Sequence, residues 1–363
     1  MPSERMLMRG SHVVGEAAVR AGCRFYFGYP ITPQNELPEY LSARLPEVGG
    51  TFIQAESEIA SINMVIGAAV TGGRAMTSSS SPGISLKQEG ISYLCGQELP
   101  AVIVNMMRGG PGLGNIAPSQ ADYFQATRGG GHGDYRVLVL APASGQELAD
   151  LTFAAFELAD RYRNPVMLLG DGLMGQMMEP VIFPDPIDPE ALPAKEWVLN
   201  GCAGRPPRAI YSMILDPPTM YQHNLSLQEK YDRMSANEIR FDEYKVDDAD
   251  LVMVAYGTAS RIAKGAVNRL RQEGQKVGLF RPVSLWPFPK RALRQVAQRG
   301  AKVAVFELSA GQMIEDVIMA VGDRSDIYFH GIPGGPIPTP AEISEFVLAV
   351  LRGDSRMGRR VEI

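Results

Sequence analysis

Residues 54–91, QAESEIASINMVIGAAVTGGRAMTSSSSPGISLKQEGI, form the stretch around which the rest of the chain is organised. Glu56 and Glu58 stand immediately before a long, mostly apolar run. The run shows no polar face, which predicts a buried helix. Because desolvating an isolated carboxylate is very costly, a carboxylate at the entrance of a buried helix must be bonded, paired or neutralised. Glu58 is therefore a candidate functional residue.

The second half of the stretch is rich in hydroxyl groups. Residues 76–85 combine serines and a threonine with Pro82 and Gly83, and a helix-like run follows from Leu86. The pattern predicts a strand, a polar turn and a helix entry that face the same place as Glu58. A helix cap followed by a simple serine loop is the alternative interpretation.

Length and composition indicate an ordinary globular protein with two domains. The 363 residues exceed the roughly 250–300 residues at which a single core stops growing. Hydrophobic residues make up 45%, charged residues 21%, and the net charge is −5, so nothing suggests binding to nucleic acid or to a membrane surface. No apolar run approaches the roughly 20 residues of a membrane span, and the N-terminus lacks the apolar core of a signal peptide. We expect a cytoplasmic protein.

The metal-binding and redox-active residue types are sparse. Cys23, Cys95 and Cys202 are odd in number and far apart, which supports neither a disulfide framework nor an iron-sulfur site. The four histidines lack the paired spacing of a zinc site. We expect no metal ligand in this chain, and we expect any redox cofactor to lie on another chain.

Strand-like and helix-like patterns alternate over residues 10–178, which predicts a parallel sheet covered by helices on both faces. The expected helices are residues 10–21, 35–44 and 145–161, and the expected strands are residues 23–27, 101–106, 137–142 and 164–172. Arg108 follows the apolar run 101–106. It thus lies where a parallel strand ends, the usual position of ligand sites in open α/β sheets.

A second, smaller α/β unit follows a proline-rich region. Prolines between residues 179 and 248 disfavour long regular elements, so we expect a linker with one helix near residues 225–240. The second unit is expected to contain strands at 251–257, 276–280, 302–308 and 326–332, helices at 259–273 and up to 298, and a turn at 281–289. The predicted division is a first domain at 1–180, a linker at 181–247, a second domain at 248–351 and a tail at 352–363.

Two motifs resemble cofactor sites but lack their context. The loop RGGPGLG, residues 108–114, has neither the GxGxxG form nor an acidic partner, so a nicotinamide site is disfavoured. The motif GDG at residues 170–172, with Asn200 downstream, resembles the Mg²⁺ and diphosphate motif of thiamine enzymes. Five prolines interrupt the segment between them, and we prefer to interpret GDG as a turn that ends a strand.

Several segments together carry a family resemblance. They are YPITP at 29–33, the opening stretch at 54–91, RGGPGLG at 108–114, NPVMLLGDGLMGQMMEPV at 164–181 and RPVSLWPFP at 281–289. In this order they resemble the α subunit of 2-oxoacid:ferredoxin oxidoreductases, and the similarity is greatest to the 3-methyl-2-oxobutanoate (2-oxoisovalerate) type. The resemblance extends over nearly the whole chain.

The resemblance implies an α/β fold with a thiamine pyrimidine-binding parallel-sheet domain and a smaller transketolase C-terminal-like domain. It also implies a hetero-oligomer. A β subunit would carry the diphosphate and Mg²⁺ site of thiamine diphosphate, and γ and small ferredoxin-like subunits would carry iron-sulfur clusters. Coenzyme A would be the co-substrate and ferredoxin the electron acceptor.

The resemblance also implies roles for individual residues. Glu58 matches the glutamate that hydrogen-bonds the aminopyrimidine ring of the cofactor, and Glu56 is expected to be structural. Thr32 matches a threonine near substrate and cofactor, and Arg108 matches the arginine that binds the 2-oxoacid carboxylate. A surface ion pair is the alternative for Arg108, and we assign no role to His132. The remaining expected cofactor contacts are Tyr29, Pro30, Ile31, Ser80 and Ser81, although the serines could equally form a tight turn.

The implied reaction is the oxidative decarboxylation of a 2-oxoacid with coenzyme A. Relatives that act on 2-oxoglutarate usually carry RGGPSTGLPT after the arginine, whereas this chain has Gly112, Leu113 and, at the last position, Ala117. The loss of these hydroxyl groups favours an apolar substrate pocket and a branched-chain acid. The alternatives are a 2-oxoglutarate:ferredoxin oxidoreductase, a non-catalytic scaffold subunit of an electron-transfer complex and a stand-alone thiamine enzyme.

Overall fold

Seven strands form the first sheet of the computed structural model, which describes residues 5–354 and 359–361. Six of the strands run parallel, as predicted, and β12 at one edge is antiparallel. In spatial order the sheet consists of β12 (Ser284–Trp286), β6 (Leu138–Leu140), β7 (Pro165–Asp171), β5 (Ala101–Met107), β4 (Ala75–Ser79), β2 (Phe25–Gly28) and β3 (Thr51–Gln54).

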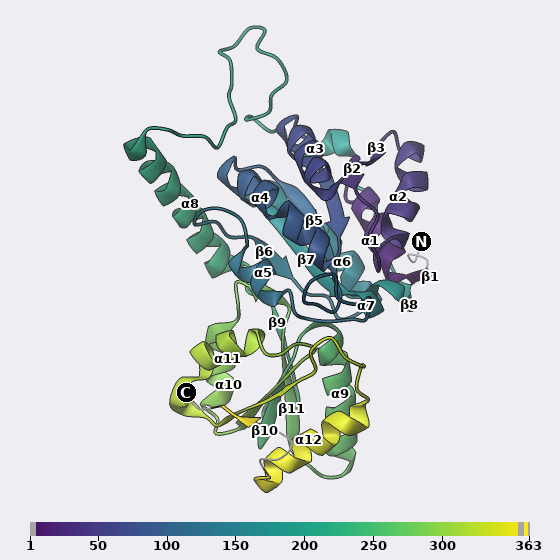
Figure 1. Cartoon of the computed structure of the whole chain (residues 1–363), viewed down its shortest axis with the longest axis vertical. Helices are drawn as coiled ribbons and strands as arrows, with labels where there is room; N and C mark the ends of the chain where they lie inside the picture. Colours follow the sequence, from purple (N-terminus) through teal and green to yellow (C-terminus); the bar gives the residue numbers. More distant parts are fainter. Residues whose placement is uncertain (1–4, 355–358, 362–363) are drawn as a thin grey trace.

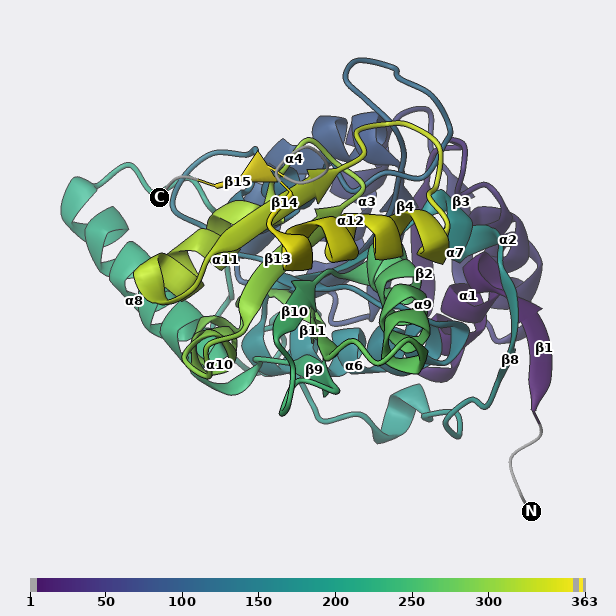
Figure 2. The ribbon, with the colours of Figure 1, turned by 90° about the horizontal axis from the view of Figure 1, so that it is seen from below.

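Helices cover both faces of this sheet (Figure 1). One face is covered by α1 (Gly10–Arg20), α2 (Glu36–Glu47), α6 (Gly145–Tyr162) and the short α7 (Gly172–Gln176). The other is covered by α3 (Glu58–Val70), α4 (Ser81–Gly96) and α5 (Tyr123–Arg128). The predicted layering is therefore confirmed. A small antiparallel ribbon of β1 (Met6–Arg9) and β8 (Met178–Val181) lies at the side of the unit (Figure 2).

The second sheet has a parallel centre and two antiparallel edge strands. In spatial order it consists of β15 (Arg359–Arg360), β14 (Ile327–Gly331), β13 (Lys302–Glu307), β10 (Leu251–Val254), β11 (Val277–Pro282) and β9 (Phe241–Tyr244). Its helices are α9 (Gly257–Gln272), α10 (Lys290–Ala297), α11 (Met313–Val321) and α12 (Pro340–Arg352), with the short 3-10 helix η2 (Gly322–Arg324). Figure 2 shows this unit in front of the first.

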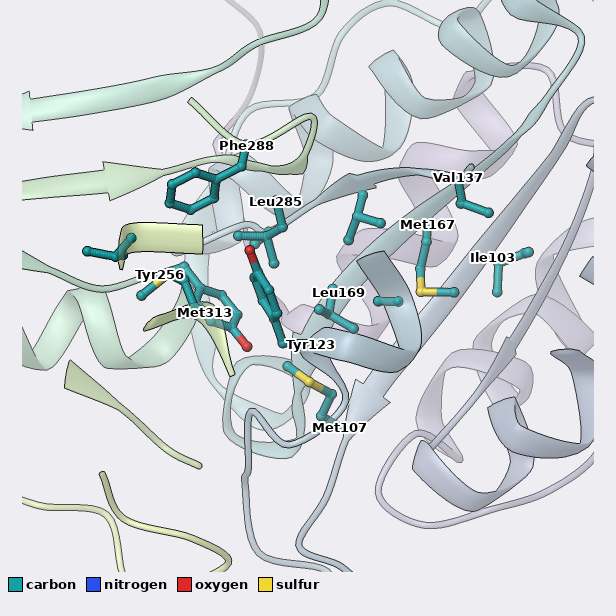
Figure 3. Close-up of a cluster of buried hydrophobic side chains, with 14 of the residues drawn as sticks. Ile103, Met107, Tyr123, Val137, Met167, Leu169, Tyr256, Leu285, Phe288 and Met313 are labelled. Atoms are coloured by element: carbon teal, nitrogen blue, oxygen red, sulfur yellow. The ribbon is translucent and has the colours of Figure 1, made fainter. Parts of the chain in front are cut away.

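One hydrophobic core runs through both units. Tyr123, Leu169 and Met107 of the first unit pack with Tyr256 and Met313 of the second in one buried cluster (Figure 3). Phe288 and Leu285 extend the same cluster. Continuous burial of apolar side chains across the boundary stabilises a fixed arrangement of the two units.

The segment RPVSLWPFP is not only a turn, which corrects the prediction. Its central residues form β12, which pairs with β6 at the edge of the first sheet. Leu285 is buried, and the Trp286 ring lies edge-on to Tyr231. The second unit therefore supplies a strand to the sheet of the first, a long-range pairing that local sequence patterns do not reveal.

The helix in the proline-rich region begins earlier than predicted. Helix α8 (Pro217–Asn237) starts with two prolines and not near residue 225. Proline fits the first turn of a helix because its missing N–H would have no partner there. The Asp216 side chain accepts a hydrogen bond from the backbone N–H of Thr219 and so caps the helix. The preceding segment first packs against the first unit, where it forms the 3-10 helix η1 (Pro189–Ala191), and then extends away from the body as a loop before α8 returns along the first unit (Figure 1).

None of the helices in the described part of the chain is long and apolar enough to cross a membrane.

Gln120 joins the two units through a buried side chain whose amide nitrogen and oxygen each form a hydrogen bond. Its Nε2 donates to the Tyr256 carbonyl over 2.8 Å, and its Oε1 accepts from the Leu308 N–H over 2.9 Å. The Gln120 backbone N–H also donates to the Leu308 carbonyl. Buried backbone groups at the start of α9 and the end of β13 thus depend on one residue of the first unit.

We predict that Gln120→Met lowers the free energy of unfolding by about 1–3 kcal/mol, because it leaves the buried Leu308 N–H without a partner and removes one of the two hydrogen bonds to the Tyr256 carbonyl. Urea unfolding followed by circular dichroism measures the change. Gln222→Met, on an exposed position of α8, is the matched control and is expected to change stability by less than about 0.5 kcal/mol. Equal stability of both variants would contradict the bridging role of Gln120.

Candidate active site

Glu58 is the first residue of α3, and its side chain is buried. The Ser57 hydroxyl accepts a hydrogen bond from the Ala60 N–H and caps the helix directly before it. No group among the described residues donates a hydrogen bond to the Glu58 carboxylate. The helix N-terminus favours a negative charge here. The side chain is 6% exposed, so its carboxylate oxygens have little access to water and keep unused hydrogen-bonding capacity, a feature that is common at functional sites.

Gly83 makes room for this carboxylate. It lies in the first turn of α4, and a Cβ added there would lie 2.7 Å from Glu58 Oε1 and 2.0 Å from Ser79 Oγ. The hydroxyls of Ser79 and Ser80 are buried and have no hydrogen-bond partner. A carboxylate and two hydroxyls with unused hydrogen-bonding capacity therefore lie around the N-terminus of α4, as the opening stretch predicts.

A fully buried lysine, which the sequence analysis missed, lies one turn further along α4. Lys87 Nζ donates to Thr77 Oγ1 over 2.5 Å and to the Ser78 carbonyl over 3.2 Å. Burial lowers the pKa of Lys87 to about 7, and attraction to Glu58 opposes this shift. A signal was present in the sequence, because Lys87 shares a helix face with the apolar residues Ile84 and Ile91.

Arg108 follows β5, as predicted, and contacts Thr32. Its Nη1 donates to the Thr32 carbonyl over 2.8 Å, and its Nη2 donates to the Leu113 carbonyl over 2.9 Å. The Arg108 Nε is buried and has no partner. Both acceptors are neutral and no ion pair to Arg108 is present among the described residues, so its alternative interpretation as a surface ion pair finds no support.

Ser81 holds the start of α4 and the start of the Arg108 loop together. Its hydroxyl donates to Asp122 Oδ2 over 2.6 Å and accepts from the Arg108 N–H over 3.0 Å. Asn105 also donates to Asp122, whose pKa is raised by burial. The hydroxyl of Ser81 is thus occupied within the chain, unlike that of Ser80. The sequence analysis missed Asp122 because no motif surrounds it.

The predicted residues form two groups that the first turn of α4 connects. Gly83 borders Glu58, and Ser81 contacts Arg108, which in turn contacts Thr32. No hydrogen bond within the described residues joins Glu58 directly to Thr32 or Arg108.

The remaining predicted contacts lie in the loop after β2. Tyr29 and Pro30 are exposed, and Ile31 is half-buried. Tyr29 and Pro30 line a cavity of about 280 Å³ between α2 and β3, which does not include Glu58. The chain therefore does not gather these residues around Glu58 by itself.

Helix α3 is not buried on all sides, which corrects the prediction. Ile59 is 50% exposed, and Asn63 and Gly67 extend the exposed stripe at intervals of four residues. An apolar pattern predicts that a helix will be covered, but it does not tell whether the same chain covers it. Part of α3 remains uncovered here.

The GDG motif is a turn at the end of a strand, as expected. Asp171 is buried at the end of β7 and accepts a hydrogen bond from the Met174 N–H, so it caps α7. Asn200 lies in the extended surface segment and accepts from Arg205. No cluster of three or more His, Cys, Asp or Glu residues suited to a metal ion occurs in the described part of the chain.

Comparisons with known sequences match nearly the whole chain. A family described as "Pyruvate flavodoxin/ferredoxin oxidoreductase, thiamine diP-bdg" matches residues 16–241, and one described as "Pyruvate:ferredoxin oxidoreductase core domain II" matches residues 249–343. The ketoisovalerate oxidoreductase subunit VorB of Methanothermobacter thermautotrophicus is 51% identical over 96% of this chain and 98% of its own length. The 2-oxoglutarate synthase subunit KorA of Methanocaldococcus jannaschii is 36% identical over 94% and 98%, respectively.

Two solved structures show a similar fold. The 2-oxoglutarate:ferredoxin oxidoreductase from Magnetococcus marinus, with 2-oxoglutarate, coenzyme A and succinyl-CoA bound, matches with a TM-score of 0.84 at 28% identity. The match covers 96% of this chain and 65% of that chain. A split-gene transketolase matches with a TM-score of 0.58 at 15% identity. This match covers 96% of this chain and 98% of the transketolase chain, and it shows similarity of fold alone.

We predict that Gly83→Ala lowers the free energy of unfolding by about 1–3 kcal/mol, because the added methyl group overlaps Ser79 Oγ and Glu58 Oε1. Chemical unfolding of the two variants and the wild type measures the effect. The matched control is Gly67→Ala on α3, where a Cβ meets open space. The free energy of unfolding of Gly67→Ala is expected to rise by up to about 1 kcal/mol, because alanine has a higher helix propensity than glycine. A Gly83→Ala protein as stable as Gly67→Ala would disprove the close approach of Glu58 to α4.

Proposed function

The chain belongs to the pyruvate flavodoxin/ferredoxin oxidoreductase family, as its sequence motifs predict, and from this premise we propose a specific reaction. We propose that it is the α subunit of an enzyme that oxidatively decarboxylates 3-methyl-2-oxobutanoate with coenzyme A and passes the electrons to ferredoxin. The observation that carries the proposal is the buried Glu58 carboxylate, which has no hydrogen-bond partner in the described chain and lies at the N-terminus of α3.

The residues around α4 fit the aminopyrimidine of thiamine diphosphate. The ring offers nitrogen donors and acceptors. The space beside Gly83 offers the Glu58 carboxylate and the unpaired hydroxyls of Ser79 and Ser80. When bound, the cofactor supplies the electron sink for decarboxylation. Glu58 would hold a proton at a ring nitrogen, and the buried serines would orient the ring and exclude water.

Arg108 is suited to the carboxylate of the 2-oxoacid. Both of its observed hydrogen bonds go to carbonyl oxygens, so its positive charge is not neutralised by a carboxylate of the described chain. The buried, unpaired Nε still has a hydrogen to donate. A guanidinium fixed by two backbone carbonyls presents its remaining donors in a defined direction. Thr32 contributes to this fixation through its carbonyl.

Partner subunits complete the site in this proposal. Five cavities of about 240–470 Å³ in the described part of the chain are lined by residues other than Glu58, and no metal-binding cluster of His, Cys, Asp or Glu is present among the described residues. We therefore assign the diphosphate and its Mg²⁺ to a β subunit, and the iron-sulfur clusters to further subunits. We assign the exposed stripe on α3, which lies next to Glu58 and leaves Ile59 50% exposed, to the contact with the β subunit.

The loop after Arg108 favours an apolar substrate. Leu113 and Ile116 are 79% and 62% exposed, and Arg108 Nη2 bonds the Leu113 carbonyl directly. Apolar side chains beside the carboxylate-binding group suit a branched alkyl chain and offer no partner for a second carboxylate. The similarity to the VorB relative supports the same substrate.

We predict that the purified multi-subunit complex prefers 3-methyl-2-oxobutanoate to 2-oxoglutarate by at least about tenfold in kcat/KM, since the apolar side chains of Leu113 and Ile116 leave the second carboxylate unpaired. Steady-state rates of ferredoxin or dye reduction with both acids test this. Pyruvate serves as a third substrate that lacks the branch. A preference for 2-oxoglutarate would refute the branched-chain assignment and would leave the family assignment intact.

We further predict that Glu58→Gln assembles normally but loses activity by about 10²- to 10⁴-fold, the typical range for a proton-holding group. Size-exclusion chromatography of the complex and initial rates are measured together. Glu56→Gln, an exposed position two residues away, is the matched control and should retain wild-type activity. A fully active Glu58→Gln complex would support the scaffold alternative.

A further inference from the structure

Asp122 stands directly before α5, but its side chain does not cap that helix. An aspartate at this position usually accepts a hydrogen bond from a backbone N–H of the first helical turn. The Asp122 side chain is instead buried and accepts two hydrogen bonds from residues that are distant in sequence. A buried carboxylate that is diverted from its own helix has a different task, and its two donors indicate which one.

Both donors lie on elements that meet at the candidate site. The Ser81 hydroxyl, at the start of α4, donates to Asp122 Oδ2 over 2.6 Å, and Asn105 Nδ2, on β5, donates to the same oxygen over 2.9 Å. Asn105 Oδ1 in turn accepts from the Ser81 N–H over 3.1 Å. The three side chains thus form a closed, buried ring of hydrogen bonds. Asparagine is disfavoured within strands, and this ring uses both ends of the Asn105 side chain.

The ring ends at the backbone of Arg108. Strand β5 ends at Met107, so the hydrogen bonds of the sheet do not extend to Arg108. Ser81 Oγ accepts from the Arg108 N–H over 3.0 Å and so holds the first residue outside the sheet. A serine hydroxyl rotates freely, and the Arg108 carbonyl lies 3.4 Å away as a second acceptor. Asp122 directs the hydroxyl proton to itself and thereby leaves the oxygen free to accept from Arg108.

The position of this backbone determines where the guanidinium lies. The Thr32 and Leu113 carbonyls hold the Arg108 side chain at its far end, and Ser81 holds the residue at its backbone. The loop that follows Arg108 contains no helix or strand up to α5. A shift of the Arg108 backbone would therefore move the guanidinium or break its bonds to the two carbonyls.

We propose that Asp122 is a positioning residue for the 2-oxoacid. Through Ser81 it fixes the backbone of Arg108, and with it the guanidinium that binds the carboxylate of the substrate. The inference rests on the proposed function, because it requires Arg108 to be the group that binds this carboxylate. Asp122 itself touches neither substrate nor cofactor. Ser81 supports Arg108 in this proposal, whereas the sequence predicts a cofactor contact for Ser81.

The test compares multi-subunit complexes that contain the wild-type chain, Asp122→Ala, Asp122→Asn or Tyr123→Phe. Tyr123→Phe is the matched control, because Tyr123 is the next residue, is also buried and loses one hydrogen bond of 2.7 Å, to Asp316. Steady-state rates give kcat and the KM values for 3-methyl-2-oxobutanoate and for coenzyme A. Calorimetry measures the binding of thiamine diphosphate with Mg²⁺ in the absence of a 2-oxoacid.

For Asp122→Ala we expect the KM for 3-methyl-2-oxobutanoate to rise by at least about tenfold, because a small misplacement of a binding group is costly. The KM for coenzyme A and the affinity for thiamine diphosphate should remain at the wild-type values. Tyr123→Phe should match the wild type in all three quantities. An unchanged KM for the 2-oxoacid in Asp122→Ala, or an equal rise in the KM for coenzyme A, would overturn the proposal.

Asp122→Asn separates the hydrogen bonds from the mere presence of a side chain. The asparagine oxygen can accept from both Ser81 and Asn105, so this variant should restore the wild-type KM. A rise as large as that of Asp122→Ala contradicts the proposal. If Asp122→Ala does not assemble, Ser81→Ala replaces it, since this change removes the acceptor of the Arg108 N–H. A wild-type KM for the 2-oxoacid in Ser81→Ala then overturns the proposal.

Arg108→Met tests the premise. Because Asp122 acts through Arg108, the change Asp122→Ala should raise the KM for the 2-oxoacid little further when Arg108→Met is already present. A full additional rise in the double variant overturns the proposal. If Arg108→Met raises this KM and Asp122→Ala does not, only the role of Asp122 fails. If Arg108→Met itself keeps the wild-type KM, the proposed role of Arg108 fails as well.

Discussion

The burial of one carboxylate constrains the architecture around the candidate site. Glu58 is held at the N-terminus of α3 and is nearly out of water, yet no group of the described chain donates a hydrogen bond to it. The neighbouring helix adapts to it with a glycine at position 83, and the buried Lys87 lies one turn further on. The carboxylate thus keeps hydrogen-bonding capacity that the described chain does not use, which is the basis for proposing a partner from outside the chain.

The repeating part of the fold was predictable from the sequence because it rests on local patterns. Strands such as β5 and β7 are short apolar runs, and α1 and α6 show clear helical periodicity that ends at recognisable residues. The position of Arg108 also followed, because a parallel strand must end where its apolar run ends. The paired prolines of α8 misled the prediction, since the same residue that excludes a helix interior starts a helix well.

The parts that could not be predicted depend on contacts distant in sequence. The role of Asp122 becomes visible only in the folded chain, where Asp122 accepts hydrogen bonds from Ser81 and Asn105. The exposure of Ile59 could not be predicted for a different reason: composition shows that a surface is apolar but not which chain covers it. The sequence therefore indicated candidate site residues, whereas the structure revealed the groups that hold them in place.

The strand β12 has a consequence for how the protein is made. It completes the first sheet beside β6, but it lies at Ser284–Trp286, far downstream of the other six strands. During synthesis the N-terminal unit emerges first. Strand β6 then remains an unpaired edge of the first sheet until β12 of the second unit has been made. Division of the chain in the proline-rich region would place β6 and β12 on different polypeptides, so closure of that sheet edge would then require the two pieces to associate.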